Sequence, residues 1–375
     1  MRKYLFIMAN EGHPWGGSEH LWSAAAERLA RRGNEVRVSA KDWGERVPEV
    51  EELRSVGCQI FYRKSPPPFL VRASRKVLRM AEYRFDHVAD AGRGVDLAVI
   101  SQGSNDDGLL LIEAARAKGL KYAILSHSAV VYWWPSDELA DRLAKVYDAA
   151  GAAYFVSQSN IELSRRQFGS KLSHAKVVRN PFNVNYNARV PWPTKPAGEL
   201  SLAFVGRLDI ISKGHDLLLQ ALARPRWRER DLHVSFVGEG PHERALRRMA
   251  DELKLTNVSF AGQVKNIEKI WSEHHALVLA SRFEGMPLVV VEAMLCARPC
   301  VVTNVGGNAD LVRDAVNGFV ARAATVDFVD EAMNRAWENR HRLQEMGDVA
   351  VKDVRNWVSK DPGEDFANEL ERLLQ

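Results

Sequence analysis

Strand-like and helical segments alternate along almost the whole chain, and this alternation limits the possible folds more than any other feature. One amphipathic stretch covers residues 18–32, where Leu21, Ala25 and Leu29 share a stripe and Gly33 follows the end. In the first half of the chain, short apolar runs typical of buried strands occupy residues 4–9, 35–40, 59–62, 96–101, 122–126 and 153–157. Such alternation predicts a parallel sheet with helices on both faces.

The alternation stops once, at residues 190–198, where three prolines and a glycine cannot continue a helix or a central strand. It then restarts, with strand-like runs at residues 200–205, 232–237, 258–261, 276–280 and 299–303. We therefore expect an α/β chain with two Rossmann-like domains that face each other across a cleft. The expected parts are a first domain at 1–190, a linker at 191–199, a second domain at 200–352 and amphipathic terminal helices at 353–375.

Composition excludes several other classes of protein. The excess of Lys and Arg over Asp and Glu, 52 against 48, is too small to indicate a nucleic-acid partner. No apolar run approaches the roughly 20 residues of a membrane span, and the first residues do not form a signal peptide, so we expect a cytoplasmic protein. Cys58, Cys296 and Cys300 fit buried, reduced thiols better than a disulfide framework or a metal site.

Two glutamates, Glu284 and Glu292, give the sharpest chemical prediction. Glu284 follows the strand-like run at 276–280, Gly285 permits close approach to a ligand, and Pro287 can open a helix that carries Glu292. Ligands of open parallel sheets bind beyond the carboxyl ends of the strands, and carboxylates accept hydrogen bonds from sugar hydroxyls. The spacing alone leaves a second interpretation open, which is an acidic helix start favoured by the helix dipole.

A pair of cations follows the run at 200–205. The chain turns at Gly206, and Arg207 and Lys213 lie on either side of the start of a helix. The planar fork of arginine and the mobile charge of lysine together suit the oxygens of a diphosphate. As residue types alone, two cations in a loop are more often simply solvated.

These two features resemble the signature of the retaining glycosyltransferases of family 4, which have the GT-B fold. The segments that carry the resemblance are Gly-Arg followed by Lys-Gly at 206–214 and the paired glutamates with seven residues between them. The resemblance implies a nucleoside diphosphate sugar as donor, with its phosphates bound by Arg207 and Lys213. It also implies that Glu284 binds a hydroxyl of the donor sugar and Glu292 the ribose, while backbone amides come from the segment Gly285, Met286, Pro287 and Leu288. The terminal helices at 353–375 are then expected to pack back on the first domain.

Other loops extend the resemblance. Gly16 and Gly17 lack the third glycine of the dinucleotide fingerprint, and they resemble the family loop that closes over the donor diphosphate; an ordinary turn is the alternative. Gly238 and the turn with Val264 and Lys265 look like segments that surround the nucleotide, and a further glycine loop lies at 305–308.

His127 follows the strand-like run at 122–126. In some family members a histidine at the corresponding place touches the donor sugar or the reacting centre. With a pKa near neutrality it can exchange a proton, and a structural histidine is the alternative.

The acceptor, a hydroxyl of a sugar, glycan or lipid-linked glycan, is expected in the first domain. Trp133 and Trp134 can stack on sugar rings or fill a core. Residues 63–84 can lie on an anionic membrane, accept an anionic or lipid-linked substrate, or form a solvated helix. Their seven cations are Arg63, Lys64, Arg72, Arg75, Lys76, Arg79 and Arg84.

The sequence thus predicts a retaining glycosyltransferase that moves a hexose in glycan, polysaccharide or glycolipid biosynthesis. No Asp-x-Asp motif occurs, so neither metal nor cofactor is expected. The expected location is the cytoplasm, with peripheral contact at the inner face of the membrane as an option. The alternatives are a GT-B sugar-nucleotide 2-epimerase and a non-catalytic sugar-nucleotide binding protein. Ala297 stands where the family usually has a helix-ending glycine, which predicts a strained left-handed residue.

Overall fold

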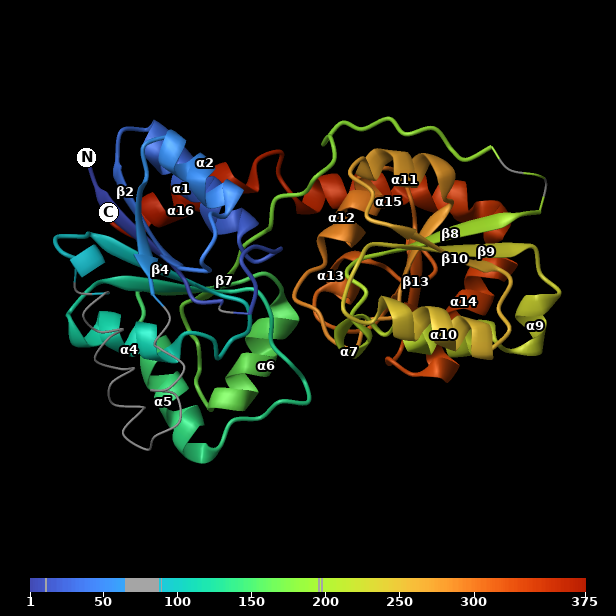
Figure 1. The fold of residues 1–375 in the computed structure, drawn as a ribbon, viewed down its shortest axis with the longest axis horizontal. Helices are drawn as coiled ribbons and strands as arrows, with labels where there is room; N and C mark the ends of the chain where they lie inside the picture. The colour runs from blue at the N-terminus through green and yellow to red at the C-terminus, as the bar shows by residue number, and fades with distance from the viewer. Residues whose placement is uncertain (11, 65–87, 89, 195, 197) are drawn as a thin grey trace. The chain divides into compact units, whose positions relative to one another are not determined.

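The structure is a computed structural model that describes residues 1–10, 12–64, 88, 90–194, 196 and 198–375. The chain forms two compact units, which are drawn in Figure 1. The first unit combines Met1–Pro181 with Asp361–Gln375, and the second consists of Phe182–Lys360.

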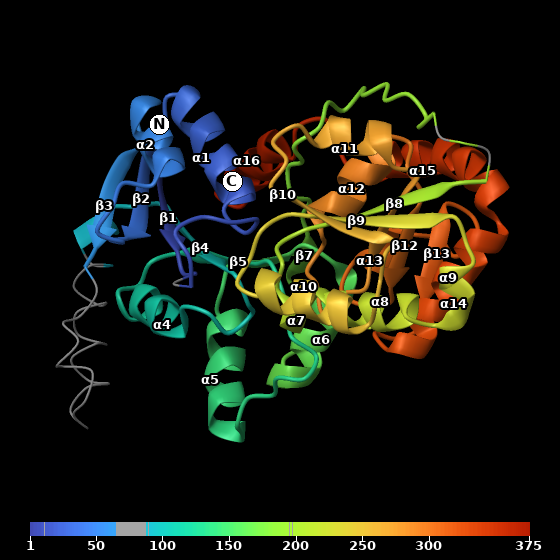
Figure 2. The ribbon, with the colours of Figure 1, turned by 45° about the vertical axis from the view of Figure 1, so that its right-hand side comes forward.

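The first unit is built on a parallel seven-stranded sheet with the order β3-β2-β1-β4-β5-β6-β7. Its strands are β1 Lys3–Met8, β2 Glu35–Lys41, β3 Gln59–Arg63, β4 Leu97–Gln102, β5 Tyr122–Ser126, β6 Ala152–Phe155 and β7 Ala175–Val177. Its helices are α1 His20–Arg31, α2 Pro48–Ser55, α4 Leu109–Ala117, α5 Asp137–Asp148, α6 Gln158–Phe168 and α16 Pro362–Arg372. Figures 1 and 2 show α1, α2 and α16 on one face of this sheet and α4, α5 and α6 on the other.

Alternating side chains of the central strand β1 fill two separate cores. Tyr4 and Phe6 pack with Trp22 of α1, whereas Leu5 and Ile7 belong to the core on the opposite face. Successive side chains of a strand point to opposite faces, so a strand that is covered on both faces becomes apolar throughout. This arrangement confirms the predicted parallel sheet with helices on both faces.

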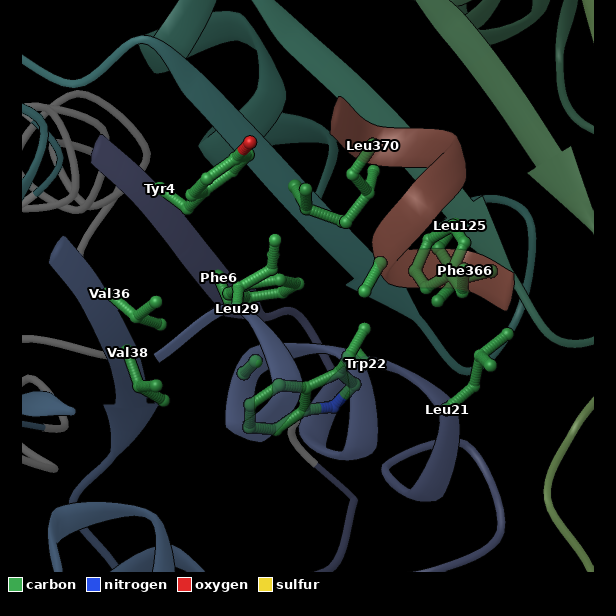
Figure 3. Close-up of a cluster of buried hydrophobic side chains, with 14 of the residues drawn as sticks. Tyr4, Phe6, Leu21, Trp22, Leu29, Val36, Val38, Leu125, Phe366 and Leu370 are labelled. Atoms are coloured by element: carbon green, nitrogen blue, oxygen red, sulfur yellow. The ribbon is translucent and has the colours of Figure 1, made fainter. Parts of the chain in front are cut away.

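Helix α16 joins the first of these cores although it follows the second unit in sequence. Figure 3 shows its residues Phe366 and Leu370 in the cluster that contains Trp22. Asp361 caps the helix by accepting a hydrogen bond from the Glu364 amide at 3.0 Å. The same carboxylate binds Arg28 of α1 at 2.9 Å, so one residue both starts α16 and ties it to its neighbour.

The second unit contains a parallel six-stranded sheet with the order β10-β9-β8-β11-β12-β13. The strands are β8 Leu200–Val205, β9 Leu232–Val237, β10 Val258–Gly262, β11 Ala276–Leu279, β12 Cys300–Thr303 and β13 Gly318–Ala321. The helices are α7 Ile210–Lys213, α8 His215–Leu222, α9 Pro225–Arg228, α10 Glu243–Glu252, α11 Ile267–Glu273, α12 Leu288–Leu295, α13 Asn308–Leu311, α14 Val326–Glu338, η2 Arg340–Arg342 and α15 Leu343–Trp357. Both ribbon views place α11, α12 and α15 on one face and α10 and α14 on the other, and Figure 2 shows α8 on the same face as α10 and α14.

Each sheet has one point at which the strand order reverses. β1 lies between β2 and β4 in the first unit, and β8 lies between β9 and β11 in the second. The connections on the two sides of such a point run in opposite directions and leave a crevice beyond the carboxyl ends of the strands, where ligands bind. The loops after β1, β8 and β11 contain Gly16, Arg207 and Glu284, so these predicted site residues lie at the reversal points.

The structure differs from the expected organisation in three details. Two short strands, β7 and β13, were not predicted; β7 has only three residues and β13 begins with a glycine, so neither carries a clear apolar pattern. The second unit begins at Phe182 instead of after residue 190, because Asn183 and Tyr186 bind residues of this unit. Residues 353–360 also remain with the second unit, and only 361–375 join the first.

The three cysteines are buried and free, as expected for reduced thiols. Within the part of the chain that the structure describes, no helix combines the length and the apolar character that crossing a bilayer requires.

Ala297, just after α12, has φ of +57°, which confirms the predicted left-handed conformation at this position. We expect Ala297→Gly to raise the free energy of unfolding by about 1 kcal/mol. The left-handed conformation costs a non-glycine residue about 1–2 kcal/mol, and the greater freedom of glycine in the unfolded chain offsets part of the gain. Urea denaturation measures the change.

Ala315 has φ of +58°, so Ala315→Gly should also raise the free energy of unfolding. Ala324, whose φ is not positive, is the control, and its replacement by glycine should not stabilise the protein. If Ala324→Gly raised the free energy of unfolding as much as Ala297→Gly, relief of left-handed strain could not be the cause.

Candidate active site

Arg207 follows β8 and is oriented by Asp209. Its guanidinium lies 3.2 Å from Asp209 Oδ2, and its side chain is 52% exposed. Asp209 also caps α7, because its Oδ1 accepts from the Ile211 amide at 3.1 Å and its Oδ2 from the Ser212 hydroxyl at 2.9 Å. Burial raises the pKa of Asp209, but the hydrogen bonds from Ser212 and Arg207 outweigh it and lower the pKa overall. The anionic cap therefore holds the arginine at the edge of the loop, accessible to a ligand.

Lys213 and Glu284 form an ion pair that joins the loops after β8 and β11. Lys213 Nζ lies 2.6 Å from Glu284 Oε1, and the two side chains are 22% and 9% exposed. The Ser281 hydroxyl donates to the same carboxylate oxygen at 2.7 Å. The Thr303 hydroxyl in turn donates to the Ser281 carbonyl at 2.6 Å. The predicted phosphate-binding cation and the predicted sugar-binding carboxylate are thus direct neighbours.

The glycine loop after β12 packs against the backbone of Glu284. Gly306 has φ of +54°, and a Cβ at this position would lie 2.2 Å from the Glu284 carbonyl oxygen. The Gly307 amide donates to the Gly285 carbonyl at 2.7 Å. Any larger residue at 306 would displace the loop that carries Glu284, so this glycine is required by packing.

Gly238 performs a similar role at the end of β9. A Cβ there would lie 2.1 Å from the Gly206 carbonyl oxygen, and the Gly238 amide donates to the Gly262 carbonyl at 2.8 Å. The loops after β8, β9 and β10 are therefore drawn together. The third of these carries Val264, which is half-buried, and Lys265, which is exposed.

The segment Gly285, Met286, Pro287 and Leu288 connects Glu284 to α12. Pro287 is the N-cap, with φ −68° and ψ 123°, so the helix begins at Leu288. No acidic residue lies in the first turn. The alternative explanation of Glu292, an acid favoured at a helix start, therefore fails because this residue lies deeper in the helix.

Glu292 is buried and bound by Asn183, a residue that the sequence analysis missed. Its Oε1 accepts from the Asn183 amide at 3.0 Å and from Asn183 Nδ2 at 2.9 Å. Burial raises the pKa of Glu292 against the lowering effect of these bonds. The residue thus anchors the start of the second unit through Oε1, and Oε2 takes no part in either bond. No motif around Asn183 indicated this contact.

In the first unit, the loop with Gly16 and Gly17 lies over a second buried carboxyl that had no predicted role. Glu19 is 1% exposed, and the Ser18 hydroxyl donates to its Oε2 at 2.8 Å. The Glu19 amide donates back to the Gly16 carbonyl at 3.1 Å. Burial raises the pKa of Glu19 to about 7, because the hydrogen bonds only partly offset the loss of solvent.

His127 lies just after β5 and is 7% exposed. Within the described residues, neither ring nitrogen has a hydrogen-bond partner. Burial lowers its pKa to about 3, so the expectation of a pKa near neutrality was wrong. The ring is neutral at physiological pH and can offer a ligand one donor and one acceptor.

The two tryptophans predicted to bind the acceptor have different environments. Trp133 is half-buried and packs against the core beneath α4 and α5, so it acts as a packing residue. Trp134 is 58% exposed and remains accessible to a ligand.

The basic stretch at 63–84 is described only at its first two residues. Arg63 is 4% exposed and donates from Nη1 to the Ser39 carbonyl and hydroxyl, both at 2.7 Å. It is therefore a structural cation inside the fold, contrary to its inclusion in a surface patch. The other residues assigned to a membrane contact, apart from the exposed Lys64, lie outside the described part of the chain. Among the described residues, no cluster of three or more His, Cys, Asp or Glu could hold a metal ion.

Two family models match consecutive parts of this chain. The model described as Glycosyltransferase Family 4 matches residues 15–186, and the one described as Glycosyl transferases group 1 matches residues 199–339. The first includes the Gly16–Gly17 loop and His127, and the second includes Arg207, Lys213 and both glutamates.

Individual proteins show the same similarity. A GDP-mannose-dependent alpha-(1-6)-phosphatidylinositol monomannoside mannosyltransferase of Mycolicibacterium smegmatis is 25% identical over 92% of this chain and 91% of its own. O-antigen chain mannosyltransferase C of Escherichia coli is 28% identical over 55% of this chain and 58% of its own. The structure of Anabaena HepE with UDP and glucose superposes with a TM-score of 0.75, at 19% identity, over 99% of this chain and 100% of its own.

The raised pKa of Glu19 predicts a pH-dependent stability. Folded Glu19 keeps its proton up to a pH of about 7, whereas the unfolded residue loses it near its ordinary pKa of 4.5. The protonated carboxyl of Glu19 therefore contributes roughly 3 kcal/mol to the free energy of unfolding below pH 4.5. This contribution is lost as the pH rises from 4.5 to about 7. Glu19→Gln, which cannot ionise, should lose this part of the pH dependence in urea denaturation between pH 4.5 and 8.

Glu45→Gln changes an exposed carboxylate and is the matched control, with a pH profile that should follow the wild type. If the free energy of unfolding of Glu19→Gln varied with pH in parallel with the wild type, Glu19 would not be the source of the pH dependence.

Proposed function

Because the chain belongs to glycosyltransferase family 4 and has the GT-B fold, we propose that it moves a hexose from a nucleoside diphosphate sugar to a hydroxyl acceptor. We further propose that the anomeric configuration of the sugar is retained and that no metal ion is needed. The product belongs to glycan or glycolipid biosynthesis. Peripheral association with the inner face of the membrane is part of the proposal, since the relatives' names include lipid-linked acceptors.

The observation that carries the proposal is the grouping of Arg207, Lys213 and Glu284 at the strand-order reversal of the second sheet. The ion pair of Lys213 and Glu284 measures 2.6 Å, and the exposed Arg207 lies on the same loop as Lys213. Two cations suit a diphosphate, and the adjacent carboxylate suits a sugar hydroxyl. The backbone of Gly285, Met286, Pro287 and Leu288 follows directly and is proposed to contact the sugar and phosphate.

Each group has a distinct task in the proposed transfer. The bond between the anomeric carbon and the β-phosphate oxygen breaks, and the acceptor hydroxyl forms the new bond to that carbon while its proton passes to the departing diphosphate. Arg207 and Lys213 stabilise the negative charge that grows on the leaving group. Glu284 orients the sugar, and Glu292 is proposed to bind the ribose. The neutral ring of His127 donates a hydrogen bond to the sugar without carrying charge.

The remaining donor contacts are proposed around these groups. Gly16 and Gly17 are assigned to the diphosphate, and Gly238, Val264 and Lys265 to the nucleotide. GDP-mannose is the first donor to test, because relatives that match over most of the chain are named as GDP-mannose-dependent enzymes. UDP sugars follow, since Anabaena HepE was solved with UDP. A donor present at 100 times its dissociation constant should stabilise the fold by about 2.7 kcal/mol, which a thermal-shift panel detects.

We expect Arg207→Ala and Glu284→Ala each to slow nucleoside diphosphate release by about 100-fold or more, because each removes a charge that contacts the reacting diphosphate sugar. Release is measured with the donor that the thermal-shift panel identifies. Circular dichroism verifies that the variants are folded.

Arg322→Ala removes an exposed arginine of the same unit, whose side chain is 73% exposed in an ion pair with Glu331, and is the matched control. Its rate should equal that of the wild type. Unchanged turnover in both Arg207→Ala and Glu284→Ala would refute the site. Conversion of the donor into a second sugar nucleotide would instead identify an epimerase.

The charge of Arg207 and Lys213 also predicts that EDTA leaves the initial rate within about twofold, since the protein itself supplies the cations for the diphosphate. The rate is measured before and after dialysis against the chelator, followed by addition of magnesium or manganese. A loss of activity that a divalent cation restores would disprove metal independence.

A further inference from the structure

A short aromatic turn, Val130 to Trp134, follows β5 and His127. Val131, Tyr132 and Trp134 are 55%, 59% and 58% exposed, while Trp133 between them packs into the core. Single exposed apolar residues are ordinary on protein surfaces. Two exposed aromatic side chains on one short turn, beside a predicted site residue, are more informative.

A buried glutamine holds this turn in shape. Gln167 of α6 is 3% exposed, and its Nε2 donates to the Val130 carbonyl at 2.9 Å and to the Trp133 carbonyl at 2.6 Å. The Trp133 amide also donates to the Val130 carbonyl at 3.2 Å. The indole of Trp134 donates to the Val131 carbonyl at 3.3 Å, which orients the ring. A surface that is ordered before binding loses less entropy when a ligand arrives.

The same buried network extends to His127. Asn105 is fully buried and donates to Gln167 Oε1 at 2.8 Å. The Tyr147 hydroxyl lies 3.0 Å from the Asn105 carbonyl and 2.7 Å from Gln102 Oε1. The Gln102 carbonyl in turn accepts from the His127 amide at 3.3 Å. The turn and His127 are therefore joined by one buried hydrogen-bond network.

The charges next to the turn select among possible ligands. Helix α5 begins directly after it, and Asp137, Glu138 and Asp141 are exposed in its first two turns. The arginine of that segment, Arg142, is bound by Glu113 at 2.7 Å. An anionic membrane or a phosphorylated ligand would be repelled by these carboxylates, whereas a neutral sugar ring would not.

We propose that the turn with Tyr132 and Trp134 is the acceptor platform and that it binds a neutral saccharide, whose ring stacks on the indole of Trp134. This inference deepens the proposed function and rests on it, because an acceptor exists only if the chain transfers a sugar. Aromatic faces bind the C–H faces of sugar rings, and the hydroxyls at the ring edge remain available for polar contacts.

Binding is tested by saturation-transfer NMR on the full chain, with methyl glycosides of the neutral disaccharides of mannose, glucose, galactose and N-acetylglucosamine as probes. The wild type should bind at least one of them. Trp134→Ala should raise the dissociation constant of that disaccharide about tenfold, which corresponds to about 1.4 kcal/mol. Trp134→Phe retains a stacking face and should stay within about threefold. Val131→Ala changes an equally exposed residue of the same turn and should have no effect.

The kinetic arm uses the same disaccharide as acceptor and measures the ratio of transfer to donor hydrolysis, which should fall about tenfold in Trp134→Ala. A wild type that releases no nucleoside diphosphate would contradict the proposed function, while the NMR result would still report on the platform. Three outcomes would overturn the platform: no disaccharide binds the wild type, Trp134→Ala binds as well as the wild type, or Trp134→Ala loses an affinity of the wild type for phosphatidylglycerol vesicles.

Discussion

The candidate donor site depends on backbone contacts that are too close to admit a side chain. A Cβ on Gly214, Gly238 or Gly306 would lie within 2.1–2.2 Å of a carbonyl oxygen of a neighbouring loop. These contacts bring the loops after β8, β9, β11 and β12 into one cluster at the carboxyl edge of the sheet. The charged groups that meet there, Lys213 and Glu284, come from segments distant in sequence, so their 2.6 Å contact requires this cluster.

Much of the fold could be predicted from local sequence patterns, and so could the positions of the candidate site residues at the ends of strands. The apolar runs that became β1 and β8 are strands covered on both faces, and Arg207, Lys213 and Glu284 follow such runs directly. The partners of these residues were not predictable. Asn183 contacts Glu292 across 109 positions, and only the folded backbone determines which polar groups meet over such a separation. Burial likewise decides the ionisation of His127, which residue type alone suggested wrongly.

In the first unit, burial shifts the pKa values of two titratable groups toward their uncharged forms. Glu19 has a pKa raised to about 7, and His127 has a pKa lowered to about 3, in both cases mainly through burial. The network from Gln102 to Gln167 consists of amides and a phenol hydroxyl. The cations of the second-unit site have no counterpart in this network. An uncharged network beneath the turn and carboxylates beside it both agree with a neutral acceptor, and the cations lie in the unit to which we assign the diphosphate.

The packing of α16 also orders events during synthesis on the ribosome. Phe366 and Leu370 complete a core whose other members, such as Tyr4 and Trp22, are translated before the whole of the second unit. The second unit is continuous in sequence and can fold as it emerges, since domains generally fold as units. The core that contains Trp22 is complete only once α16 has also been synthesised. The apolar face that α16 covers therefore stays incomplete while the second unit is being synthesised.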